Sequence, residues 1–134
     1  MIIIGAGQAG AQTAISLRQM RFDGRITLLG DERYPPYQRP PLSKKVMTGE
    51  MDLERTYIRS EAYYAKSSID LQQGVQVTGI DRAARTVTCA DGTILDYDYC
   101  VICTGTRARR LDLPGGDLPG VLYLRTLEDS ERIK

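Results

Sequence analysis

Histidine is missing from the 134-residue sequence. Its absence removes the commonest general base, the commonest protein metal ligand and every nucleophile that depends on a Ser–His or Cys–His pair. No metal site is expected. Any redox or group-transfer chemistry is expected to come mainly from a bound cofactor.

Cysteine is scarce, and neither sign of charge is in excess. Three cysteines, an odd number, imply no disulfide framework and favour a reducing, cytoplasmic environment. Eighteen basic and seventeen acidic residues leave a net charge of +1, which predicts neither a nucleic-acid partner nor a membrane-surface partner. No apolar run approaches the roughly 20 residues that a membrane span needs. These features predict one soluble globular domain.

The most informative pattern lies in the first ten residues. The apolar run Ile2–Ile4 leads into glycines spaced G-x-G-x-x-G, and a helical pattern follows over residues 8–22. In a dinucleotide-binding fold, Gly5 makes the tight turn, Gly7 lets a pyrophosphate approach the backbone, and Gly10 lets helix and strand pack closely. A turn without function is the alternative interpretation, but the strand before and the helix after favour dinucleotide binding.

Two further features of this region support a phosphate site. Gln8 and Ala9 open the helix, where unpaired N–H groups and a partial positive charge attract phosphates. Residues 25–29 read as a second parallel strand, so the first 30 residues predict a βαβ unit.

Asp31 and Glu32 follow this second strand, twenty-one and twenty-two residues after Gly10. A carboxylate at this place in a dinucleotide fold can accept hydrogen bonds from both ribose hydroxyls. The sequence favours Glu32 slightly over Asp31 without deciding between them. Both could instead simply cap or solubilise the loop.

Residues 30–41 contain four prolines and two tyrosines and show no periodic pattern. Proline fixes φ and biases the residue before it to extended geometry, which predicts a stiff, extended segment. A short helix is predicted over residues 41–47, ended by Gly49. The segment is either a rigid connector or, like other loops at the carboxyl ends of parallel strands, part of a ligand site. In the second interpretation, Arg39 could fork onto a pyrophosphate, and Lys44 could lie near a redox cofactor and favour its negatively charged reduced form.

The rest of the chain predicts a small parallel sheet with an antiparallel insertion. In chain order, the predicted elements are a helix capped by Ser60 over residues 61–66, a strand over 69–71, antiparallel strands over 75–80, 85–89 and 93–97, a strand over 99–103, a strand over 121–124, and a helix capped by Thr126 that begins at Leu127. The strand over 99–103 is continuously apolar, as expected of a strand that is buried on both faces. The last helix has no stop signal, which suggests a fragment of a longer protein.

Cys100 and Cys103 spell C-x-x-C, but residues three apart on a strand point to opposite faces. Their sulfurs are therefore expected to diverge, and they and Cys89 are expected to fill the core as small hydrophobes. Thr104 and Gly105 form a small turn in which the backbone can approach a ligand. In the basic cluster of Arg107, Arg109 and Arg110, one side chain is a candidate phosphate ligand.

Five segments of the chain, taken in order, match a known family. They are residues 2–10, 29–32, 36–44, 104–105 and 124–129, of which P-Y-Q-R-P-P-L-S-K at 36–44 is the most specific. Together they resemble the N-terminal part of FAD-dependent ferredoxin reductases of the putidaredoxin reductase and biphenyl dioxygenase reductase type. Apoptosis-inducing factor shares the R-P-P-L-S-K segment. The resemblance extends over essentially all 134 residues.

The resemblance implies an α/β fold, namely a Rossmann-like, glutathione reductase-like FAD-binding domain with an inserted three-stranded antiparallel β meander. Residues 1–134 would be the first segment of that domain. It also implies roles for individual residues: the pyrophosphate of FAD over Gly5, Gly7 and Gly10, its ribose near Asp31 or Glu32, Arg39 and Arg109 near the pyrophosphate, Lys44 beside the flavin N5 edge, the Val77 backbone at the adenine, and Thr104-Gly105 closing over the cofactor.

Members of this family take a hydride from NADH onto FAD and pass electrons singly to a [2Fe–2S] ferredoxin that serves an oxygenase. The sequence lacks the redox cysteine pair of dithiol reductases, so disulfide reduction is disfavoured. It also ends where the NADH domain, the second FAD segment and the C-terminal domain would follow. We therefore expect this chain alone to hold half a flavin site and not to turn over. The competing hypotheses are a non-catalytic flavin or nucleotide module related to apoptosis-inducing factor, another pyridine-nucleotide flavoprotein reductase, and an NAD-dependent dehydrogenase domain without flavin.

Overall fold

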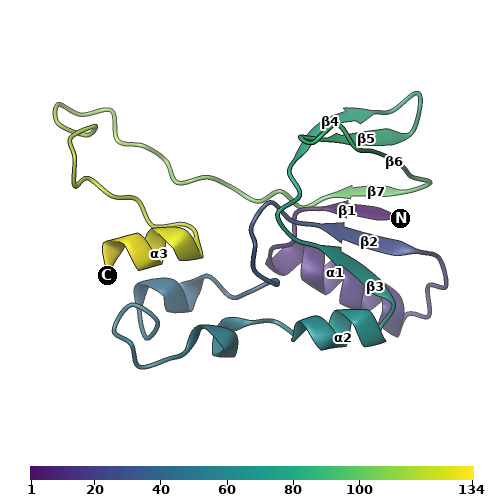
Figure 1. The fold of residues 1–134 in the computed structure, drawn as a ribbon, viewed down its shortest axis with the longest axis horizontal. Coiled ribbons are helices and arrows are strands. Elements are labelled where there is room, and N and C mark those ends of the chain that lie inside the picture. The colour runs from purple at the N-terminus through teal and green to yellow at the C-terminus, as the bar shows by residue number, and fades with distance from the viewer. The chain divides into compact units, whose positions relative to one another are not determined.

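The computed structural model describes all 134 residues, which form a mixed α/β structure (Figure 1). Its elements are β1 (Ile2–Ile4), α1 (Gln8–Gln19), β2 (Ile26–Leu29), the 3₁₀ helices η1 (Pro40–Ser43) and η2 (Leu53–Thr56), α2 (Glu61–Lys66), β3 (Ile69–Gln72), β4 (Val77–Asp81), β5 (Thr86–Cys89), β6 (Ile94–Asp96), β7 (Cys100–Ile102) and α3 (Leu127–Ile133). The chain divides into two compact units. The first unit comprises Met1–Tyr37 and Tyr57–Gly105, and the second comprises Gln38–Thr56 and Thr106–Lys134.

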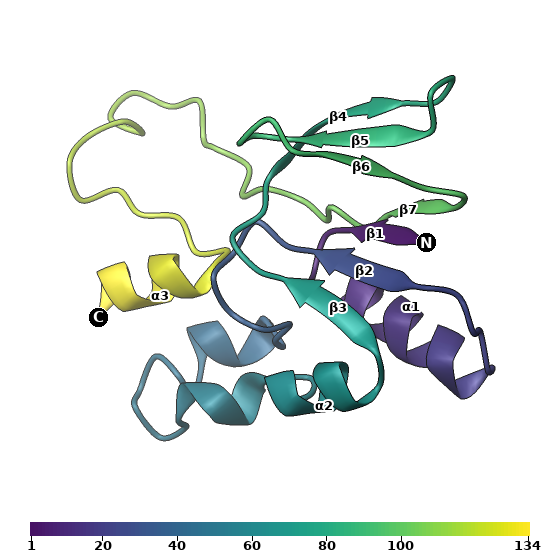
Figure 2. The ribbon, with the colours of Figure 1, turned by 45° about the vertical axis from the view of Figure 1, so that its right-hand side comes forward.

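The first unit is built on a parallel sheet with strand order β3-β2-β1-β7. Helices α1 and α2 lie on one face of this sheet, and the strands β4, β5 and β6 lie on the other (Figure 2). Consecutive isoleucines of β1 serve the two faces in turn, because side chains alternate along a strand. Ile3 belongs to the core under the helices, whereas Ile2 and Ile4 belong to the core under the antiparallel strands. The Rossmann-like fold class predicted from the sequence is confirmed.

The antiparallel strands form the predicted meander, in the order β4-β5-β6. Its turns are closed by aspartates, which hydrogen-bond readily to backbone groups two residues further on. The Asp81 carboxylate accepts from the N–H groups of Ala83 and Ala84 at 2.8 Å, and Asp91 accepts from Thr93 at 2.9 Å. Gly92 supplies the positive φ of 86° that the second turn requires.

Helix α1 ends at Gln19, three residues before the predicted Phe22. Arg21 takes the left-handed conformation with φ of 62°, and the N–H of Phe22 donates to the Leu17 carbonyl at 2.9 Å. The N–H of Arg21 donates to the Arg18 carbonyl at 3.0 Å. Together these two hydrogen bonds form a Schellman motif. The sequence prediction was wrong here because a non-glycine residue occupies the position where glycine is the usual stop signal.

The Arg18 side chain braces the same end of the sheet. Its guanidinium donates to the carbonyls of Phe22 and Gly24 at 2.6 and 2.8 Å, in the turn before β2. It also donates to Ser67 and Ser68 at 3.0 and 2.6 Å, in the turn before β3. One side chain thus links the chain segments that enter two neighbouring strands at their amino ends.

Two strand predictions fail. β7 is an edge strand that pairs only with β1, and Ile102 at its end is 64% exposed, although the apolar run predicted burial on both faces. Residues 121–124 form no strand, and Val121 and Leu122 are exposed. An apolar run identifies a strand suited to burial, but the elements packed on each face of the sheet decide whether its side chains are covered.

In the second unit, the predicted helix over residues 41–47 is reduced to the 3₁₀ turn η1, followed by irregular turns up to Gly49. The helix stops at Lys44, whose φ of −132° and ψ of −116° lie outside the helical region. η1 contacts α3, where the buried Ser130 hydroxyl donates to the Leu42 carbonyl at 3.1 Å. Arg39 donates to the Arg125 carbonyl at 2.7 Å.

The predicted cap of α3 is confirmed as a reciprocal capping box. The Thr126 hydroxyl accepts from the N–H of Asp129 at 3.2 Å, and the Asp129 carboxylate accepts from the N–H groups of Thr126 and Arg125 at 2.8 and 2.9 Å. Burial alone would raise the pKa of Asp129, but the hydrogen bonds from Thr126 and Arg125 outweigh it and hold the pKa below its usual value. The charged form of Asp129 therefore stabilises the fold.

This capping predicts an acid-sensitive contribution to stability. A carboxyl group with a pKa lowered by folding adds stability above its unfolded pKa, near 4, and loses it as the pH falls through the folded value. Asp129→Asn is expected to lower the free energy of unfolding by about 1 kcal/mol at pH 7. Its difference from wild type should shrink below about pH 4 in thermal melts. Asp117→Asn, at an exposed aspartate of the same unit, is the control, and identical behaviour of both variants would contradict the assignment.

Candidate functional site

The carboxyl ends of the parallel strands meet at one edge of the sheet. Ile4 is in register with Leu29 of β2 and with Ile102 of β7. The hydrogen bonds continue past the strand ends, because Gly5 donates to the Leu29 carbonyl at 2.8 Å and Cys103 donates to the Ile4 carbonyl at 2.7 Å. The glycine loop, the acids after β2 and the turn after β7 therefore leave the sheet together, at the edge where such folds bind ligands.

Two of the three fingerprint glycines are required by packing. Gly5 has φ of 104°, and a Cβ on it would lie 2.2 Å from the Cys103 carbonyl oxygen. A Cβ on Gly10 would lie 2.0 Å from the Gly5 carbonyl oxygen. Both distances are far below any tolerated contact, so these glycines let the end of β7, the turn and the start of α1 stack directly.

Gly30 has the same role but was not singled out in the sequence. A Cβ on Gly30 would lie 2.6 Å from the Cβ of Ala6, so the segment carrying Asp31 and Glu32 begins against the glycine loop. The available signal was a glycine directly after the second strand.

Gly7 differs from these glycines. Its φ of −84° suits any residue, and no atom lies within 4 Å of the Cβ it lacks. Gly7 is the N-cap of α1, which has neither a side-chain cap nor an acidic residue in its first turn. The first N–H to bond within the helix is that of Ala11, to the Gly7 carbonyl, so the amides of Gln8, Ala9 and Gly10 lie before it. Open space over uncapped amides suits an anion such as a pyrophosphate.

The structure distinguishes the two acids. Asp31 is exposed, whereas Glu32 is partly buried and its carboxylate accepts a hydrogen bond from the Tyr37 hydroxyl. The Glu32 carbonyl also accepts from the N–H of Gly74 at 3.0 Å. Tyr37 was not among the predicted site residues, because nothing in the sequence marks which tyrosine of the proline-rich segment would reach an acid.

The other predicted residues of the first unit lie in two places. Thr104 and Gly105 are exposed directly after β7, beside the glycine loop, and Gly105 has φ of 70°. Val77 begins β4 where the register with β5 is irregular, and its side chain packs on the core that contains Ile2 and Ile4.

Arg39, Lys44 and Arg109 belong to the second unit. Arg39 is partly buried and lines a cavity of about 250 Å³ together with Arg125. Lys44 follows η1 and is exposed, as is Arg109 in the segment before α3.

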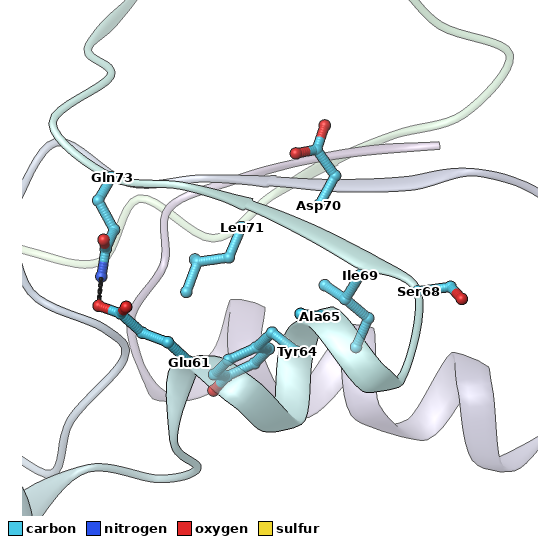
Figure 3. A pocket seen from close by; sticks show the side chains of 8 residues that line it. All are labelled: Glu61, Tyr64, Ala65, Ser68, Ile69, Asp70, Leu71 and Gln73. Carbon is cyan, nitrogen blue, oxygen red and sulfur yellow. Dashed lines mark hydrogen bonds between the residues drawn. The ribbon is translucent and has the colours of Figure 1, made fainter.

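A further open pocket of about 490 Å³ lies between α2 and β3 (Figure 3). Gln73 donates to Glu61 at 3.1 Å at one end of it. The buried hydroxyl of Tyr64 has no partner, and burial raises the pKa of Tyr64 to about 12. None of the predicted nucleotide-binding residues lines this pocket, so it lies outside the candidate site.

The cysteines are unpaired. Burial raises the pKa of Cys89 and of Cys100, which keeps both thiols protonated at neutral pH and therefore poorly reactive. No group of Cys, Asp or Glu side chains in the structure could hold a metal ion. Every helix of the structure is too short or too polar to cross a bilayer.

Comparison with known proteins decides the family. All 134 residues match the model of the pyridine nucleotide-disulphide oxidoreductase family. The chain belongs to this family. Among curated members, it is 48% identical to the probable ferredoxin reductase CtmF of Castellaniella defragrans over 134 residues, the whole of this chain and 33% of that protein. It is 46% identical to rhodocoxin reductase of Rhodococcus erythropolis over 133 residues, 99% of this chain and 31% of that protein.

Solved structures of this oxidoreductase family give the same result. The chain superposes on one chain of the crystal structure of the covalent putidaredoxin reductase–putidaredoxin complex with a TM-score of 0.89 and 40% sequence identity. The match covers 97% of this chain and 32% of that chain. The chain thus spans about a third of the length of the family members it matches.

Proposed function

We propose that this chain is the FAD-binding part of an NADH-dependent ferredoxin reductase, with residues 1–134 forming the first segment of the FAD-binding domain. The observation that carries the proposal is the open space at Gly7, over the uncapped first turn of α1. Its similarity over its whole length to proteins named ferredoxin reductases supports the type of enzyme. The three unpaired cysteines support a cytoplasmic location.

The first unit would hold the adenylate part of FAD. The glycine loop and the amides of Gln8 and Ala9 would bind the pyrophosphate. Glu32, rather than the exposed Asp31, would accept the ribose hydroxyls, since it lies at the same strand edge and is already held in place by a hydrogen bond. The backbone of Val77 would meet the adenine, and Thr104-Gly105 would close over the cofactor.

The second unit contributes three basic side chains to the proposal. Arg39 and Arg109 would approach the pyrophosphate, because guanidinium groups bind phosphate oxygens in a fork. Lys44 would lie beside the flavin N5 edge, where its positive charge favours a negatively charged reduced flavin. The cavity shared by Arg39 and Arg125 is the feature of this unit that suits an anion.

Bound FAD would supply the redox chemistry, taking a hydride from NADH and releasing electrons singly to a [2Fe–2S] ferredoxin that serves an oxygenase. The residues of this chain would bind and orient the FAD. They neutralise the diphosphate, fix the ribose and set the charge around the cofactor.

In the full-length protein, we expect a visible absorption spectrum with flavin bands and NADH-driven reduction of a [2Fe–2S] ferredoxin. A colourless protein would contradict the FAD assignment. Flavin without ferredoxin reduction would leave a flavin module and remove the reductase function.

The two acids provide a sharper test on the 134-residue chain. Glu32→Gln is expected to weaken ADP binding about tenfold, since a charged hydrogen-bond acceptor for the ribose is lost. The matched variant Asp31→Asn should bind ADP like wild type in isothermal titration calorimetry. The reverse order of the two variants would assign the ribose to Asp31.

A further inference from the structure

We propose that Tyr37 is a positioning residue whose hydroxyl holds the Glu32 carboxylate in the orientation that receives the ribose of an adenine nucleotide. The inference rests on the proposed function, because it takes Glu32 as the ribose ligand. It adds a residue that neither the glycine fingerprint nor the basic residues of the proline-rich segment would suggest.

The contact itself joins a buried donor to a partly buried acceptor. The Tyr37 hydroxyl donates to Oε2 of Glu32, and the Tyr37 side chain is only 5% exposed. An ionised carboxylate offers about four acceptor positions on its two oxygens, and the phenol occupies one of them. A hydrogen bond to an ionised group is also stronger than one between neutral groups.

The backbone holds Tyr37 in place. Tyr37 forms an isolated antiparallel bridge with Tyr57, and the N–H of Ile58 donates to the Pro36 carbonyl at 2.8 Å. Pro35 and Pro36 directly precede Tyr37, and both are buried. Their rings fix the φ angles of the backbone that leads to Tyr37. The hydroxyl therefore sits on a rigid support rather than on a mobile loop.

Glu32 is fixed from its other end by the chain that leaves β3. Its carbonyl accepts from Gly74, and the carbonyl of Gly30 accepts from Val75 at 2.7 Å. With its main chain held there and its carboxylate held by Tyr37, the side chain loses its rotational freedom before a nucleotide arrives. Such preorganisation improves affinity because binding then causes no further loss of side-chain conformational entropy.

The test compares two nucleotides that differ at the ribose. In isothermal titration calorimetry, wild type is expected to bind ADP at least about tenfold more tightly than 2′-deoxy-ADP, since only ADP presents both hydroxyls to Glu32. Tyr37→Phe should weaken ADP about five- to tenfold and 2′-deoxy-ADP, which keeps only the 3′-hydroxyl, clearly less, so the preference shrinks. The effect of Tyr37→Phe should disappear when Glu32→Gln is already present.

The control is Tyr97→Phe, which removes a hydroxyl that donates to the Asp81 carbonyl at 3.4 Å in the meander. Tyr97→Phe should change neither the affinity for ADP nor the affinity for 2′-deoxy-ADP. If Tyr37→Phe weakens both nucleotides equally, or acts unchanged in the Glu32→Gln background, the positioning role is overturned while the proposed function stands. A wild-type chain that binds neither nucleotide would overturn the proposed function, and this inference with it.

Discussion

Gly10→Ala is expected to destabilise the first unit by about 3 kcal/mol or more, because the added carbon has no space. Its Cβ would lie 2.0 Å from the Gly5 carbonyl oxygen and 3.2 Å from Cδ1 of Leu28. The first neighbour is backbone and cannot rotate away. It can move only if the turn at Gly5 moves, and Gly5 is itself pressed against the Cys103 carbonyl.

A loss of this size is a large part of the roughly 5–15 kcal/mol that stabilises an ordinary domain. It should lower the melting temperature by about 10 °C in thermal unfolding followed by circular dichroism, or leave the chain unfolded at room temperature. Gly79→Ala, at a glycine without a positive φ whose missing Cβ would meet only the Cβ of Thr88 at an ordinary 3.9 Å, serves as a comparison for the added methyl group alone. A Gly10→Ala chain that melts within about 2 °C of wild type would show that the loop relaxes freely.

Gly7→Ala is expected to give the opposite pattern, with folding retained and nucleotide binding lost. Gly7 has φ of −84° and open space where a Cβ would stand, so alanine fits the free chain. The loss of stability should remain below about 1 kcal/mol, the usual cost of alanine at an N-cap. The same methyl group would occupy the space that a pyrophosphate needs, and ADP affinity should fall by about 10- to 100-fold, since forcing one carbon into a close contact costs about 1–3 kcal/mol.

Circular dichroism melts and ADP titration on the same Gly7→Ala sample separate the two effects. Gln12→Ala, on an exposed position of α1 beyond its first turn, is the matched control and should leave ADP affinity unchanged. Wild-type affinity in Gly7→Ala would show that no ligand approaches the backbone at this turn. The glycine fingerprint would then serve packing alone.

The glycine loop was predictable because its function depends on neighbours in the sequence. Gly5 and Gly10 lie within one strand–turn–helix unit, and their spacing already encodes the close approach that the structure shows. The meander was predictable for the same reason, because aspartate and glycine turns such as Asp91-Gly92 specify hairpins locally.

Features that depend on distant segments could not be predicted. The exposure of Ile102 depends on which elements pack on that face of the sheet, and nothing in residues 100–102 encodes that. The hydrogen bond between Tyr37 and Glu32 depends on a proline-fixed turn and on the bridge to Tyr57, twenty residues further along the chain. Arg18 donates a hydrogen bond to the carbonyl of Ser68, fifty residues further along the chain. A single arginine in a helical pattern does not indicate which distant backbone group it will contact.

Arg18 gives the amino ends of the parallel strands a side-chain brace. Its guanidinium ties together the turns that lead into the amino ends of β2 and β3. At the opposite ends, a bound nucleotide would supply the counter-ion of the helix amides under the proposed function. Hydrogen exchange slowed by nucleotide should therefore concentrate at residues 5–10 and 30–32, while the turns around Arg18 keep the rigidity they already have.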